Sequence, residues 1–314
     1  MVVIAAALGA AMIVGFVWWD KNYNHSSSSQ TEETADDGVV EVPADVAKIQ
    51  DAVNQAKAGD TIKIAAGTFT DASTTNGISS IIRVDKALTI EGAGRDKTIL
   101  DGKRKVMFGI FVPEGISGKV VIKDMTIKNF ENNSIDALNK TIEVSGTTLS
   151  GNGNQGAYFK DSSSSSKFYN NIVADNTFLG LQIEKSAVKI YNNTIANNGT
   201  VGISLVVTDT NPKGTSPEIY NNIVTGHSRY GLLYTNPAFP QDAVVDHNNM
   251  FANGAAYFEY LNNEQTKKKA VNPTPGTGNV AVDPNYTDDS FKLPANSSLK
   301  KASRSGSELG AYGK

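Results

Sequence analysis

The chain has 314 residues, of which 39% are hydrophobic and 19% charged, as is typical of a folded protein rather than a disordered one. Its 29 basic and 32 acidic residues give a net charge of −3, without the basic excess expected of a nucleic-acid-binding protein. Cysteine is absent and only 3 histidines occur, which excludes disulfide frameworks, thiolate metal sites and cysteine nucleophiles, and argues against multi-histidine metal centres.

The first expected element is an apolar helix over Met1–Trp19, a run without charged or strongly polar side chains. As a helix this run would be about 28 Å long, close to the hydrocarbon core of a bilayer. We therefore expect residues 1–21 to form an uncleaved membrane anchor; a cleaved signal segment and a buried helix are the alternatives. Residues 22–41, which contain a serine run and an acidic cluster, are predicted to be a solvated linker.

A short amphipathic helix is predicted over about residues 46–57, because apolar residues follow helical spacing there and Gly59 offers a stop. From there to about residue 272, the sequence has the pattern of short strands separated by Gly, Asn and Ser. Residues 273–314 lose this pattern. Because both ends of a stack of strands expose unpaired edges, we expect the helix and the C-terminal segment to act as caps.

The strand region repeats every 22 to 29 residues in three series that run in step. One series centres on an apolar residue, at Ile127, Leu149, Val173, Ile195, Val224 and Phe251. Another begins with glycine, at Gly156, Gly180, Gly202 and Gly231, and a third ends in asparagine pairs that place Asn171, Asn193, Asn222 and Asn249 at one turn. Series that share a period indicate a solenoid. The sequence therefore predicts an all-β, right-handed parallel β-helix over residues 42–272, with the central apolar residues stacked inward.

Three stretches carry a resemblance to a known group of proteins. IQDAVNQAKAGDTIKIAAGTFTD (49–71) and ALTIEGAGRDKTILDG (87–102) resemble the first coils of the pectate-lyase-like superfamily of right-handed parallel β-helix proteins. The tail (282–313) is similar to that of bacterial surface β-helix proteins, with Ser297-Ser298 where a Ser-Pro pair is usual. The resemblance covers about residues 42–313. It implies the fold more strongly than an activity, because the superfamily includes lyases, hydrolases, epimerases, adhesins and inert surface proteins.

Catalytic candidates are sparse on the predicted coils. Lyases of this superfamily use clustered carboxylates for Ca²⁺, whereas strand alternation leaves only Glu184 outward in the glycine series, where we expect it to pair with Lys160. We therefore expect no metal site and no cofactor. The weak catalytic candidates are Glu184, His227 and Arg229. Whether the protein is an enzyme stays open; an enzyme of this kind would be a polysaccharide lyase or a glycoside hydrolase.

Two histidines fall on repeat positions, which favours structural roles for them. His227 stands where Asn176 and Asn198 stand in earlier coils, so it is expected at a turn. His247 is expected to stack on a ladder of tyrosines, which comprises Tyr169, Tyr191 and Tyr220.

Aromatic residues in the glycine series favour carbohydrate binding. Tyr158 and Gln182 are predicted to point outward on neighbouring coils, and Tyr230 lies beside the glycine of a later coil. We therefore expect an exported, surface-associated protein that binds or processes polysaccharide at Tyr158, Gln182 and Tyr230. It would be extracellular, anchored in the membrane through residues 1–19, or secreted if that segment is cleaved. The alternative is a structural or adhesive surface protein without catalysis that forms homo-oligomers through its N-terminal helix.

Overall fold

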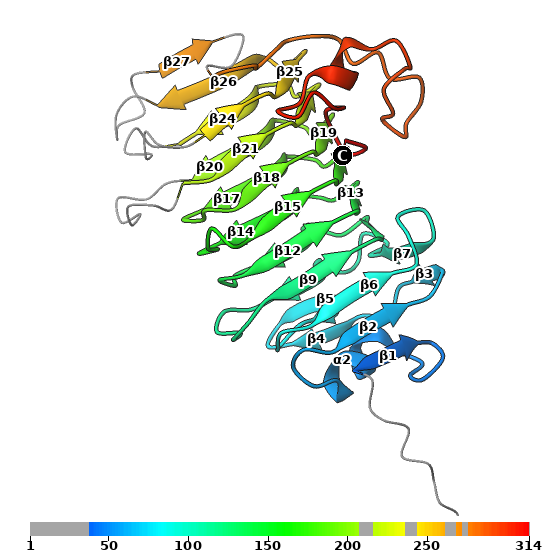
Figure 1. The fold of residues 1–314 in the computed structure, drawn as a ribbon. Helices are drawn as coiled ribbons and strands as arrows, with labels where there is room; N and C mark the ends of the chain where they lie inside the picture. Colours follow the sequence, from blue (N-terminus) through cyan, green and yellow to red (C-terminus); the bar gives the residue numbers. More distant parts are fainter. Residues whose placement is uncertain (1–37, 207–215, 236–243, 261–267, 272–275, 314) are drawn as a thin grey trace, which may run out of the picture. The chain divides into compact units, whose positions relative to one another are not determined.

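The computed structural model describes residues 38–206, 216–235, 244–260, 268–271 and 276–313 (Figure 1). The predicted anchor and most of the predicted linker lie outside these residues. Within the described part of the chain, no helix is both long and apolar enough to cross a membrane.

The described residues form three sheets (Figure 1). Sheet A contains β1 (Val39–Val42), β2 (Thr61–Ile64), β6 (Thr89–Gly92), β9 (Val120–Lys123), β12 (Ile142–Ser145), β15 (Lys167–Tyr169), β18 (Lys189–Tyr191), β21 (Glu218–Tyr220) and β24 (Val244–Asp246). Sheet B contains β3 (Gly67–Phe69), β7 (Thr98–Asp101), β10 (Thr126–Lys128), β13 (Thr148–Ser150), β16 (Ile172–Ala174), β19 (Thr194–Ala196), β22 (Ile223–Thr225) and β25 (Asn249–Phe251). Sheet C contains β4 (Ser73–Thr75), β5 (Ile78–Arg83), β8 (Phe108–Val112), β11 (Asn133–Ala137), β14 (Gln155–Lys160), β17 (Leu179–Glu184), β20 (Val201–Val206), β23 (Tyr230–Tyr234), β26 (Ala255–Tyr260) and β27 (Lys268–Val271).

The chain visits sheets A, B and C in turn and then starts the next coil. Each strand pairs in parallel with its counterpart one coil away, except that β4 with β5 and β26 with β27 form antiparallel pairs at the two ends of sheet C. This arrangement confirms the predicted parallel β-helix. Strand β1 starts at Val39, three residues before the expected start of the solenoid, and pairs with β2.

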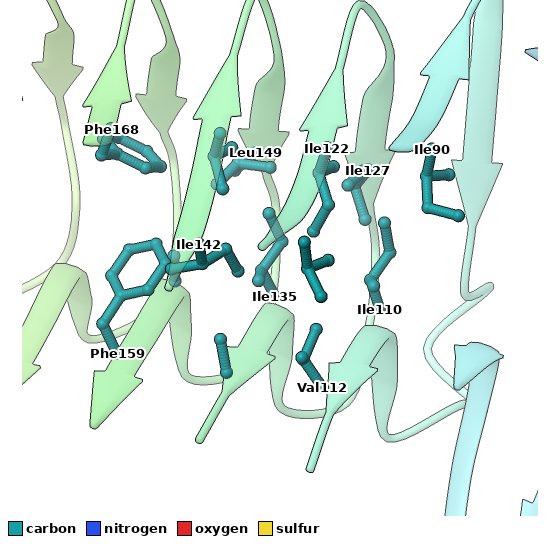
Figure 2. Close-up of a cluster of buried hydrophobic side chains, with 14 of the residues drawn as sticks. Ile90, Ile110, Val112, Ile122, Ile127, Ile135, Ile142, Leu149, Phe159 and Phe168 are labelled. Atoms are coloured by element: carbon teal, nitrogen blue, oxygen red, sulfur yellow. The ribbon is translucent and has the colours of Figure 1, made fainter. Parts of the chain in front are cut away.

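Apolar side chains fill the space between the sheets (Figure 2). In sheet B, register places the predicted residues in one row, which runs through Ile127, Leu149, Val173, Ile195 and Val224. None of these five side chains is exposed. Figure 2 shows Ile127 and Leu149 of this row among side chains of sheets A and C. The stacked interior row is therefore confirmed for these five residues.

The last coil differs from the expectation by one residue. Val224 pairs with Met250, which is buried, and Phe251 pairs with Thr225 instead. Likewise, Asn248 rather than Asn249 accepts the hydrogen bond from the backbone N–H of Asn222. The error has a simple origin, because three polar residues in a row, HNN, allow two alignments with the earlier YNN motifs, and the buried row selects the other one.

Two ladders of buried side-chain amides connect the coils. At the turn from sheet A to sheet B, the backbone N–H of each ladder residue donates to the side-chain oxygen of the next, through Asn171, Asn193, Asn222, Asn248 and Asn279. The turn from sheet B to sheet C carries Asn152, Asn176, Asn198, His227 and Asn253, with the same backbone-to-side-chain bonds except that the Asn198 side-chain amide donates to His227 Nε2. The residue before the ladder position at the first turn takes a left-handed backbone, with φ between 50° and 58° at Asn170, Asn192, Asn221 and His247. Asparagine is the residue that accepts this conformation most readily after glycine.

The two ends of the described chain pack on the solenoid differently. Helix α2 (Ile49–Gln55) buries Ile49, Ala52 and Val53 and contacts β1, β2 and β5. The C-terminal segment, which includes a 3₁₀ turn at Ser298–Lys301, runs along sheet B (red in Figure 1). Its leucines pack on Ile223, and Ala311 packs on Ile172 and Ala174. The segment therefore covers the outer face of sheet B as well as approaching the last coil.

Candidate functional site

The outer face of sheet C carries two rows of side chains. One row contains Phe108 and Asn133, and the other contains Phe111 and Asp136 three residues further along each strand. The rings of Phe108 and Phe111 stack with centroids 5.7 Å apart, and the Asn133 amide donates to Asp136 Oδ2 at 2.8 Å. Both rows therefore lie on the same face. We call the part of this face on β11, β14 and β17 the sheet C strip.

Tyr158 and Gln182 lie side by side at the centre of the sheet C strip, as the sequence predicted. They are register partners on β14 and β17, and both side chains are half-buried. The Tyr158 hydroxyl donates to Glu184 Oε2 at 2.6 Å. Burial and this carboxylate raise the pKa of Tyr158, so the phenol stays protonated and acts as a donor at neutral pH.

The expected ion pair between Glu184 and Lys160 is wrong. The two residues are register partners, but among the described residues no ion pair joins them, and the carboxylate is engaged by the tyrosine instead. Lys160 is half-buried on the outer face. The Tyr158 hydroxyl reaches from β14 to the Glu184 carboxylate on β17. The alternation of side chains along one strand does not predict such a contact.

Asp136 is the one carboxylate of the strip that the sequence analysis missed. It is the register partner of Tyr158 on β11, and its side chain is only 8% exposed. Desolvation raises its pKa to about 6, opposed by the hydrogen bond from Asn133. A signal was present, because Ser134 lies 22 residues before Gly156 and continues the glycine series by one coil. Serine in the place of glycine concealed that continuation.

Two buried amide oxygens beneath the strip have no hydrogen-bond partner. They are Asn133 Oδ1 and Gln155 Oε1, on side chains that are 2% and 3% exposed. Each residue stands two positions before the paired Ile135 and Ala157, so they are neighbours across β11 and β14.

An exposed aromatic ring flanks the strip. Phe178 is 52% exposed and immediately precedes β17, and its backbone N–H donates to the carbonyl of Asn154 at 2.9 Å. The Asn154 amide in turn donates to Asn132 Oδ1 at 2.9 Å. The exposed ring is held on a turn beside amide groups and is available to stack on a ligand. The sequence analysis did not single out Phe178.

The remaining predicted site residues do not join this cluster. His227 is 1% exposed, its Nδ1 lies 2.7 Å from Asn253 Oδ1, and burial lowers its pKa to about 4. It is a ladder residue, as its repeat position predicted, and has no access to a ligand. Arg229 is exposed at the turn before β23, and Tyr230 is half-buried at the start of that strand, two coils from Gln182.

The tyrosine ladder lies on sheet A and is closed to ligands. Tyr169, Tyr191 and Tyr220 stack with centroids 4.9 and 5.0 Å apart and nearly parallel planes. The guanidinium of Arg304 covers the last ring at 3.7 Å. His247 does not extend the ladder, because Asp246 is the register partner of Tyr220. Ring faces that cover one another leave only their edges for a sugar, so the ladder is a structural feature.

A hollow of about 570 Å³ lies between α2 and the first strands of sheets B and C. Gln50, Phe69 and Arg83 are among its lining residues. The Arg83 guanidinium lies 5.0 Å from the ring centroid of Phe111, its register partner. Arg83 thus belongs to the outward row that continues through Phe111 and Asp136 to Tyr158. In the described part of the chain, no group of three or more His, Asp or Glu side chains is placed to hold a metal ion.

Comparisons with known proteins agree with this architecture. The family profile described as right handed beta helix region matches residues 89–266. The A-module of the Azotobacter vinelandii mannuronan C-5 epimerase AlgE4 has a similar structure, with a TM-score of 0.52, 18% identity, and coverage of 70% of this chain and 70% of that chain. For the pectate lyase Pel9A the TM-score is 0.49, with 12% identity and coverage of 84% of this chain and 90% of that one. No curated protein sequence matches the chain. At these identities the likeness shows the fold alone.

Proposed function

Because the chain belongs to the right-handed β-helix family, we propose that its solenoid binds a polysaccharide on the sheet C strip. The observation that carries this proposal is the pairing of Tyr158 with Gln182, together with the exposed ring of Phe178 at the start of the same strand as Gln182. Aromatic rings stack on the apolar faces of sugars, and amides supply directional hydrogen bonds. The fold shared with the mannuronan epimerase module adds support for a polysaccharide ligand.

The proposed activity is binding without turnover. The raised pKa of Tyr158 favours a hydrogen-bond donor over a catalytic base, since a base must lose its proton near the operating pH. His227, one of the three catalytic candidates, is buried in the amide ladder. Of the catalytic candidates taken from the sequence, only Arg229 and Glu184 remain, and Glu184 is engaged by the tyrosine hydroxyl. Asp136, whose pKa of about 6 would suit a general base, is only 8% exposed and accepts the hydrogen bond of the Asn133 amide.

We place the protein at the cell surface, where such a strip would meet a polysaccharide. The support for this location is the apolar run at Met1–Trp19, which has the length of a membrane-spanning helix. The structural or adhesive role is the competing function, and it predicts a strip without affinity for glycans.

Calorimetric titration of the protein with a panel of neutral and acidic oligosaccharides tests the proposal. Phe178→Ala should weaken binding about fivefold or more, because a stacked aromatic contributes about 1 kcal/mol or more. Val244→Ala is the matched control, since Val244 is 40% exposed and lies on sheet A. Absence of binding to every glycan, or equal affinities of wild type and Phe178→Ala, would refute the proposal.

A further inference from the structure

We propose that the sheet C strip takes an uncharged polysaccharide and discriminates against polyuronates, an inference that rests on the function proposed above. The reason lies in the charges and hydrogen-bond acceptors that the described strands present outward.

The strip has no cationic excess. Its three strands carry Asp136, Lys160 and Glu184 outward, one cation against two carboxylates. The neighbouring strands β8, β20 and β23 contain no charged residue. A polyuronate brings one carboxylate per sugar, and a run of such charges needs several cations to offset its desolvation and the mutual repulsion.

The turns next to these strands do not change that balance. At the ends of β11, β14 and β17, the two acidic residues Glu131 and Asp161 are equalled in number by two basic ones, Lys140 and Lys185. The nearest arginine of the outward row, Arg83, lies on β5 against the ring of Phe111. Among the residues that the structure describes, no cluster of basic side chains therefore faces the space above Tyr158 and Gln182.

Hydrogen-bonding capacity points to the same class of ligand. Asp136 and Glu184, the two carboxylates of the strip, are hydrogen-bond acceptors when ionised. Sugar hydroxyls donate hydrogen bonds, whereas an ionised uronate carboxylate only accepts them. A surface with these two acceptors and one stacking ring therefore fits a hydroxyl-rich, uncharged chain.

Matched pairs of probes isolate the effect of charge. Oligogalacturonate and oligomannuronate are each compared with their carboxyl-reduced forms, which keep the linkages and hydroxyls but lose the negative charge. In calorimetric titrations at low salt, with and without added Ca²⁺, we expect the reduced form of the better-binding pair to bind at least about tenfold more tightly than its uronate. Glu184→Gln should reduce the ratio between the affinities for the reduced form and for the uronate. Glu218→Gln on sheet A should leave that ratio unchanged.

The result that overturns the inference is a uronate that binds as tightly as its reduced form, whether alone or with Ca²⁺. If Phe178→Ala also weakens that uronate, binding on the strip stands and only the proposed charge selectivity fails. If neither form of either pair binds, and no glycan of the wider panel does, the proposed function itself fails.

Discussion

Individual residues on the sheet C strip show how one fold position acquires different chemistry. Asp136, Tyr158 and Gln182 occupy the same register position on successive coils. Desolvation disfavours the charge of the aspartate, while the tyrosine reaches a neighbouring carboxylate. The position along the coil determines that a side chain faces outward, and the neighbours on the adjacent coils determine what it can do.

Asp136→Asn is expected to stabilise the protein at neutral pH. The folded-state pKa of about 6 lies above the ordinary 3.8, so the native state binds more protons than the unfolded state between these values. The stability that protonated Asp136 contributes is therefore fully present below about pH 4 and lost as the pH rises through 6. A shift of about two units corresponds to an upper limit of about 3 kcal/mol. Asparagine keeps the acceptor for Asn133 and removes this loss.

Denaturant titrations from pH 4 to pH 8 check this expectation. Asp136→Asn should gain stability over the wild type as the pH rises, and the two curves should meet near pH 4. Equal pH dependence of the two proteins would show that Asp136 is solvated in solution.

At the scale of single elements, the amide ladders fix the register of the coils. The side-chain oxygen of a ladder asparagine accepts from the backbone N–H and the side-chain amide of the ladder residue one coil earlier, as Asn198 does from Asn176. A histidine at one ladder position introduces a titratable group into an otherwise uncharged column. Its Nε2 lies 3.2 Å from the Asn198 amide nitrogen, so it accepts there, and Nδ1 then donates to Asn253.

His227→Asn should make the protein more resistant to acid. Burial depresses the pKa of His227 to about 4, so its contribution to stability is complete above about pH 6.5 and is lost as the pH falls towards 4. The full loss amounts to about 3 kcal/mol as an upper limit. Asparagine fills the same slot in four other coils, at Asn152, Asn176, Asn198 and Asn253, and can repeat their hydrogen bonds.

Thermal unfolding at pH 7 and pH 4.5 measures the effect. The wild type should lose more stability than His227→Asn between these two pH values, in the opposite sense to the Asp136→Asn comparison. A variant that is as acid-sensitive as the wild type would mean that other groups set the acid limit.

These elements also show how far sequence reasoning extends. The shared period of three series predicted the solenoid, the buried row and the turn position of His227, because each depends on repetition alone. It misplaced Asn249 and Phe251 by one residue, since an ambiguous alignment is resolved only by which side chain is buried. It missed Asp136 and Phe178, whose importance comes from burial and exposure. The path of the C-terminal segment along sheet B could not be predicted, because it depends on contacts between residues more than 80 positions apart in the sequence. One example is the hydrogen bond from the Arg304 backbone N–H to the Asn221 side chain.

At the scale of the whole described solenoid, stability is shared among coils that each contact only their neighbours. Most strands are therefore protected on both edges, and the first and last strands need separate cover. At the start of sheet A, β1 covers the edge of β2 by pairing with it along its whole length, buries Val42, and is itself contacted by helix α2. The boundary between the first 37 residues and the rest follows from this pairing.

Two truncations that differ by five residues test where the folded unit begins. Deletion of residues 1–37 keeps β1 and should leave the midpoint of thermal unfolding nearly unchanged. Deletion of residues 1–42 removes β1, exposes the edge of β2 and takes away the buried Val42 side chain. Loss of that side chain alone is worth about 1.5 kcal/mol or more, and the freed strand edge adds a tendency to aggregate. Circular dichroism melts and light scattering of both proteins provide the measurement. A large loss of stability in the shorter deletion would show that the first 37 residues support the solenoid. Equal stability of the two truncations would show instead that β1 contributes nothing to it.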